Sequence, residues 1–399
     1  MHLLTLDHSH RDEESGMGHK YPPLAEVRKS LQVKWYRCPV EREKLRALSQ
    51  RSDLQGWCQA GGHFALFAST ATLTYLFWSQ AMWLAFVVTL WLHGTVASFF
   101  SGVAPHELGH GTVFRTPWLN KVFLHLFSLI SWWDPYDYAA SHTYHHRYTA
   151  YPDADRENLL PLTPSLRPSL LLQLFSVNLF SKPGRNFGKG GLLWAVAMTV
   201  QSALGRPGPT EIPSREWLQA LHADQPNQHR RSIWWSRVLL LFHGTVLVVS
   251  IASGLWVVPL LISFPSFIAN WGTYFTGLPQ HCGLRDNVPD FRKNTRSMRL
   301  NPLLEFLYWH MNWHTEHHMY AAVPCYNLKK LAGEIAGDMP EPRTLSGAWR
   351  EMRATWRRQQ TDPGYQFDTP LPASAEQAGA DNEDELASSI GELAPKELQ

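Results

Sequence analysis

The chain of 399 residues is poor in charge, and its cysteines form no recognisable pattern. Charged residues make up 18% of it, below the roughly 25% that is usual for soluble chains. The formal net charge of +2 is too small to indicate a nucleic-acid partner. The four cysteines are scattered without a C-x-x-C pair, which argues against a disulfide framework and against a thiolate metal site. The N-terminal residues contain no apolar run long enough for a signal peptide, so we expect any membrane insertion to use internal segments.

Aromatic residues and apolar segments, by contrast, are abundant. Aromatics reach 13%, with 18 Trp, and excess Trp suits helix ends that lie at membrane interfaces. Two pairs of apolar segments each approach the roughly 20 residues that cross a bilayer. Neither pair has a charged residue at its turn, so we expect two transmembrane hairpins. Their four spans are predicted at residues 63–79, 81–104, 238–254 and 255–276.

The distribution of Lys and Arg predicts the topology. These residues are absent from both hairpins and lie in the N-terminal arm, in the section 105–237 and after residue 277. The positive-inside rule places all three in the cytosol, with both termini inside. The expected fold is therefore an all-α integral membrane protein with four spans and a cytosolic helical cap. We expect a cytosolic arm at 1–56, a membrane domain at 57–340, a cytosolic helix at 341–369 and a disordered acidic tail at 370–399.

Histidine is concentrated in three clusters that follow or lie between the apolar segments. The first is H-E-L-G-H, and the other two, H-T-Y-H-H and H-T-E-H-H, share the spacing i, i+3, i+4. On a helix this spacing brings the imidazoles to one face, and neutral imidazole is a good ligand for Zn, Fe, Cu or Ni. The candidate metal ligands are His106, His110, His142, His145, His146, His314, His317 and His318.

Eight histidines are too many for one ion, because zinc sites close at four ligands and octahedral ions at six. Two ions with four or five ligands each would fit. The clusters offer a single Glu-x-x-His, from Glu107 to His110, whereas soluble carboxylate di-iron bundles use two such pairs. Glu107 and Glu316 therefore suit a supporting role, as hydrogen-bond partners that orient ligating rings. Asp137 and Asp153, beside the second cluster, are candidates for the same role, with a solvated loop face as the alternative.

The three histidine motifs, in this order around two apolar hairpins, resemble the membrane fatty-acid desaturase and hydroxylase superfamily over about residues 60–335. The resemblance implies a non-haem di-iron centre, O₂, an external electron donor and removal of hydrogen from an unactivated C–H bond. It makes the eight clustered histidines iron ligands and points to His281, in L-P-Q-H-C-G, as a ninth. His310, one turn before His314, is a rival for which a supporting role is favoured. An asparagine that holds a metal-bound water would be Asn270 or Asn312.

The resemblance implies an O₂-dependent membrane desaturase that introduces a double bond into the acyl chain of a lipid or acyl thioester. The motifs do not distinguish this from a hydroxylase or monooxygenase of a lipid or small amphiphile. The chain has no cytochrome-b5-like H-P-G-G segment, so we expect a separate ferredoxin-like or cytochrome-b5-like donor. A multi-pass protein of this kind would lie in the endoplasmic reticulum of a eukaryote or the inner membrane of a bacterium. H-E-L-G-H also fits the zincin pattern, but an intramembrane zinc metalloprotease leaves six of the eight histidines unexplained.

Overall fold

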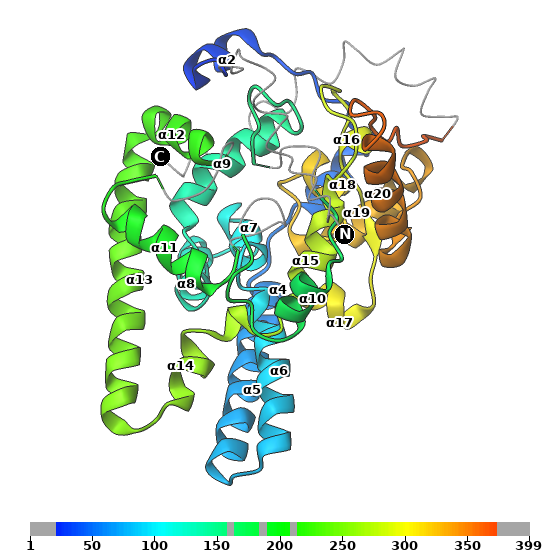
Figure 1. Cartoon of the computed structure of the whole chain (residues 1–399). Coiled ribbons are helices and arrows are strands. Elements are labelled where there is room, and N and C mark those ends of the chain that lie inside the picture. The colour runs from blue at the N-terminus through cyan, green and yellow to red at the C-terminus, as the bar shows by residue number, and fades with distance from the viewer. Residues whose placement is uncertain (1–20, 158–162, 183–189, 208–213, 373–399) are drawn as a thin grey trace, which may run out of the picture.

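The computed structural model describes residues 21–157, 163–182, 190–207 and 214–372. The predicted acidic tail lies almost wholly outside these residues, as does the start of the N-terminal arm. The described chain is mainly helical (Figure 1). Its one sheet consists of two short parallel strands, β1 (Met298–Arg299) and β2 (Arg343–Thr344). The predicted all-α class is confirmed at this level.

The first predicted hairpin is formed by α5 (Gly62–Ser79) and α6 (Trp83–Ser98). It projects from the helical body (Figure 1), and large apolar side chains such as Leu84 are exposed on it. The second predicted span ends earlier than expected, at Ser98. A turn through Gly102, with φ of 78°, leads into α7 (Val103–Gly109), which carries the first histidine motif.

The third predicted span is part of a longer helix, α13 (Pro226–Ser253). Proline at its first position is favoured because the missing N–H would have no partner there. Gly254, with φ of 71°, ends the helix in the left-handed conformation that glycine adopts most readily. Among the described residues, two helical stretches are long and apolar enough to cross a membrane. One is Trp83–Gly109, which joins α6 to α7 through the turn at Gly102, and the other is Pro226–Ser253. These two stretches suggest membrane association.

The fourth predicted span, 255–276, is not one continuous helix. The structure divides it into α14 (Val257–Ile262), the 3-10 helix η2 (Pro265–Phe267) and α15 (Trp271–Gly277). Proline interrupts a helix because it lacks an N–H and its ring clashes with the preceding turn. After η2, the backbone N–H of Ala269 donates to Ser176 O at 2.8 Å. This part of the segment is therefore attached to the helical body.

Shorter helices form the body that carries the histidines. The N-terminal arm contributes α2 (Leu24–Ser30), α3 (Arg42–Leu48), α4 (Asp53–Gly56) and a π-helical turn, η1 (Trp57–Gly61). The central helices are α8 (Pro117–Ile130), α9 (Pro135–Tyr148), α10 (Pro168–Phe175), α11 (Leu192–Ala203) and α12 (Ser214–Asp224). The later ones are η3 (Leu278–Gln280), α16 (Phe291–Asn294), α17 (Pro302–Leu307), α18 (His314–Met319), η4 (Cys325–Asn327), α19 (Leu328–Glu334), η5 (Ala336–Asp338) and α20 (Leu345–Gln359). The last lies within the predicted C-terminal helix.

The largest hydrophobic core packs α6, α7 and α8 against the section from α17 to α19. Phe100 and Phe127 stack with ring centroids 4.2 Å apart, and the ring of Trp309 meets Phe127 edge-on. All three side chains are fully buried. This core holds the first and third histidine motifs together although about 200 residues separate them.

Candidate metal centre

Nine histidines come together in two groups, and all but His110 and His146 are buried. Within each group, atoms able to bind a metal all lie within 4.8 Å of one another. The groups are supplied by α7 and the residue after it, by α9, by α18 and by the turn that follows η3. The first group contains His106, His110, His142, His146 and His317, and the second contains His145, His281, His314 and His318. All eight histidines of the sequence motifs are therefore brought together, and His281 joins them.

Helix geometry explains how each H-x-x-H-H motif supplies both groups. In α9 the i, i+4 pair His142 and His146 enters the first group, whereas His145 enters the second. In α18 the i, i+4 pair His314 and His318 enters the second group, and His317 enters the first. Residues i and i+4 lie nearly above one another, while i+3 is rotated to their other side. One motif can thus serve two sites.

The donor set fits two metal ions, because the Nε2 atoms converge without other partners. Nε2 of His314 lies 2.8 Å from that of His281 and 3.1 Å from that of His318. In the first group the Nε2 atoms of His106, His110 and His142 are buried and have no hydrogen-bond partner among the described residues. Leaving a buried polar atom unpaired costs roughly 1–3 kcal/mol. A cation that accepts the lone pairs would remove this cost in both groups.

Carboxylates contact Nδ1 of three of the rings, the nitrogen opposite the converging Nε2 atoms. Nδ1 of His106 lies 2.9 Å from Oε1 of Glu107, as expected from the sequence. Nδ1 of His145 lies 2.9 Å from Oδ2 of Asp155. On the same helix, Nδ1 of His142 lies 3.1 Å from Oε1 of Glu157. Such bonds fix the tautomer with its Nε2 lone pair directed inward and make that nitrogen a better ligand.

Two further rings use neutral acceptors. Nδ1 of His281 lies 3.0 Å from the backbone oxygen of Asn294, and Nδ1 of His318 lies 3.1 Å from Oγ1 of Thr149. The sequence pattern alone did not indicate Glu157, Asn294 or Thr149, and it suggested no role for Asp155. Asp155 and Glu157 belong to the acidic run D-A-D-R-E after the second motif, which was the available signal.

The other carboxylates predicted to orient ligating rings have different contacts. Oδ1 of Asp137 bonds His222, outside both groups, at 2.9 Å. Asp153 lies close enough to Tyr21 and Arg156 to interact with each electrostatically, and Asp155 contacts His145 instead. Glu316 accepts a hydrogen bond from Ser297, not from a clustered ring. The partners of Asp137 and Glu316 are thus a histidine outside both groups and a serine. The supporting role of these carboxylates stays a prediction.

His310 does not share a helical face with His314. Residues 308–313 form turns, and both Trp309 and His310 have positive φ, of 53° and 56°. Nδ1 of His310 lies 3.4 Å from Oε1 of Glu305, and His310 belongs to neither group. Its side chain therefore contacts the turn that precedes α18 and neither group.

Burial keeps most of these rings neutral. Burial, and then neighbouring imidazoles, hold the pKa values of His142, His314 and His318 well below the usual range. Burial would also lower the pKa of His145, but the Asp155 carboxylate outweighs it and raises that pKa. Burial raises the pKa of Glu157 to about 7. A neutral imidazole is the form that binds a metal.

A cavity of about 430 Å³ reaches both groups. Its wall includes histidines of each group together with Leu174 and Met198 on the apolar side. Asn270 also lines it, 3.5 Å from Nδ2 of Asn178. Asn312 instead donates to Met298 O at 2.8 Å. Of the two asparagines named from the sequence, Asn270 therefore faces the cavity.

The family comparison agrees with this arrangement. The family model described as fatty acid desaturase matches residues 81–347, which is more than half of the chain and includes all nine histidines. The chain therefore belongs to the fatty acid desaturase family. Membership implies an oxidoreductase with a desaturase-like function and a lipid or acyl substrate. No curated protein matches the chain significantly.

Proposed function

We propose that this protein is an O₂-dependent membrane desaturase that introduces a double bond into the acyl chain of a lipid or acyl thioester. The observation that carries the proposal is the division of nine histidines, seven of them buried, into groups of five and four beside one cavity. A zinc protease needs only one such group. A pair of irons uses both, and family membership supports iron.

In this proposal each group of histidines holds one iron. Bound iron would activate O₂ and supply the oxidising power that removes hydrogen from an unactivated C–H bond. Asp155, Glu157 and Glu107 hold their rings with Nε2 directed inward. Leu174 and Met198 provide apolar surface against which an alkyl chain would pack.

Substrate position would decide between a double bond and an alcohol, because a displacement of about 1 Å at a reacting carbon costs about 100-fold in rate. We place α5, α6 and α13 in the bilayer and the histidine groups on its cytosolic side, in keeping with the distribution of Lys and Arg. Electrons would come from a separate ferredoxin-like or cytochrome-b5-like protein.

Metal analysis and lipid mass spectrometry test the proposal together. Purified protein should contain two irons per chain, and His145→Ala should lower that content while the protein still inserts into the membrane. His222→Ala, which changes a histidine outside both groups, is the matched control. Lipids from expressing cells should contain species lighter by two hydrogens, and these should be absent with His145→Ala.

Other outcomes would contradict the proposal in distinct ways. One zinc per chain would favour the protease. Products heavier by one oxygen would identify a hydroxylase with the same centre. Full iron content in His145→Ala would remove the second group from the site.

A further inference from the structure

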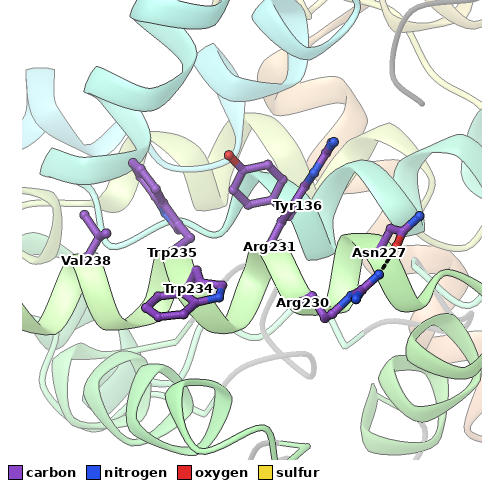
Figure 2. A pocket seen from close by; sticks show the side chains of 7 residues that line it. All are labelled: Tyr136, Asn227, Arg230, Arg231, Trp234, Trp235 and Val238. Atoms are coloured by element: carbon purple, nitrogen blue, oxygen red, sulfur yellow. Dashed lines mark hydrogen bonds between the residues drawn. The ribbon is translucent and has the colours of Figure 1, made fainter.

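A second cleft, of about 580 Å³, lies on the surface beside the N-terminal half of α13. Figure 2 shows its seven lining side chains, six from α13 and one, Tyr136, from α9. None of the seven is acidic. They are Tyr136, Asn227, Arg230, Arg231, Trp234, Trp235 and Val238. We propose that this cleft binds the phosphate headgroup of an anionic phospholipid, a site separate from the histidine groups and their cavity.

Helix spacing places an arginine one turn before a tryptophan at two neighbouring positions on the surface of α13. Arg230 and Trp234 are four residues apart, as are Arg231 and Trp235, so each pair lies along one side of α13. In Figure 2 the ring of Tyr136 lies between Trp235 and Arg231. This pairing of arginine with tryptophan suits a membrane interface, because indoles prefer the headgroup level and guanidinium groups bind phosphate in a bidentate manner.

No carboxylate in the described part of the chain neutralises the two arginines of the cleft. Arg230 donates to the side chain of Asn227, a neutral partner. No carboxylate among the described residues pairs with Arg230 or Arg231, and both side chains are exposed. The indole of Trp234 is 65% exposed. The cleft therefore presents positive charge to a ligand that approaches from outside.

The opposite wall is fixed. The Tyr136 hydroxyl and Nε2 of His125 are 2.9 Å apart. Nε1 of Trp235 donates to Trp133 O at 2.8 Å. Because these contacts hold the aromatic side chains in place, little conformational freedom would be lost when a headgroup binds.

The position along α13 selects a lipid over a soluble phosphate. About 20 helical residues cross the hydrocarbon core of a bilayer. Twenty residues counted back from Ser253, the end of α13, reach Trp234. They include one charged residue near that end, Arg237, whose guanidinium carbon lies 4.8 Å from the centroid of the Trp234 ring. The intervening face carries exposed apolar side chains, with Leu241 72% and Ile251 71% exposed. If α13 crosses the membrane as proposed, the arginines lie at the level of the phosphates, where each cation contributes about 1 kcal/mol of attraction to anionic lipid.

The test measures lipid binding directly and requires neither iron nor turnover. The full chain in detergent is titrated with phosphatidylglycerol or with phosphatidylcholine of the same acyl chains, and bound lipid is counted by native mass spectrometry. Wild type should retain one phosphatidylglycerol in preference to phosphatidylcholine. Arg230→Gln combined with Arg231→Gln should weaken that binding roughly 10- to 30-fold.

The control is Arg350→Gln combined with Arg357→Gln, an equal loss of charge at exposed sites on α20. It should bind phosphatidylglycerol as wild type does. Equal loss in both double variants would reduce the effect to net charge and overturn the proposal. The proposal would also be overturned if wild type bound the two lipids equally, or if excess glycerol 3-phosphate displaced the bound lipid. If the Arg230/Arg231 variant kept its lipid but lost turnover with a protein reductant, the cleft would be a protein dock instead.

Discussion

Nδ1 of His145 and Oδ2 of Asp155 lie 2.9 Å apart, although ten residues separate them in the chain. The same carboxylate accepts the backbone N–H of Ala150 at 2.9 Å and that of Glu157 at 3.1 Å. Asp155 therefore shapes the turn after α9 and orients a ring of the second group at the same time. By accepting the backbone N–H of Glu157, Asp155 also helps to place the Glu157 carboxylate that contacts His142.

Asp155→Asn should weaken metal binding in the second group. The amide can accept one hydrogen bond but cannot stabilise the His145 ring with a negative charge, and loss of such a partner typically costs about 10- to 100-fold in metal affinity. Iron retained per chain during dialysis against a chelator measures the effect. Asp153→Asn, two residues away, should retain iron as wild type does. Equal retention in both variants would contradict the role of Asp155.

His281→Ala and His310→Ala should differ sharply. His281 supplies one of four ligand-capable atoms of the second group, so its removal should cost about half of the bound iron when four ligands close a site. Among the described residues the side chain of His310 bonds Glu305, so its removal should leave iron content unchanged and lower stability by no more than about 1 kcal/mol. Iron content and melting temperature separate the two. Loss of iron in His310→Ala would place it back among the ligands.

Gly94→Ala should destabilise the junction between α6 and the broken fourth segment. A Cβ at Gly94 would lie 2.3 Å from Ile268 O, a backbone atom that cannot move aside cheaply. Overpacking of this kind costs about 1–3 kcal/mol, and it would also disturb the neighbouring cavity residue Asn270. Thermal unfolding in detergent is the measurement. Gly244→Ala in α13 is the control, because nothing lies within 4 Å of its added Cβ; an equal loss there would contradict the packing argument.

Glu305 should make the stability of the protein depend on pH, through its contacts in the turn before α18. Burial alone would raise its pKa, but hydrogen bonds from His310 and Trp313 outweigh it and lower the pKa to about 2. A pKa below its value in the unfolded chain, 4.5, means that the contribution is full above pH 4.5 and fades as the pH falls toward 2. The melting temperatures of wild type and Glu305→Gln should therefore differ near neutral pH and converge in acid. A constant difference across this range would contradict the assignment.

Several features could be predicted from the sequence alone because they are local. Helix periodicity is determined by neighbouring residues, so the spacing of His314, His317 and His318 was enough to predict a shared surface. The apolar runs predicted α5, α6 and the C-terminal half of α13. Family resemblance then added His281, which has no clustered neighbour of its own.

Only the tertiary structure decided how these parts combine. It assigned His145 to a different group from His142 and His146, because the assignment depends on which helix packs against each side of α9. It selected Asp155 and Glu157 over Asp137 and Asp153, since the choice rests on the path of the turn after α9. It also broke the fourth apolar segment, where contacts such as that between Ala269 and Ser176 replace a continuous helix. The local sequence pattern determined which histidines could bind a metal. Long-range packing determined which of them share a group and which carboxylates hold their rings.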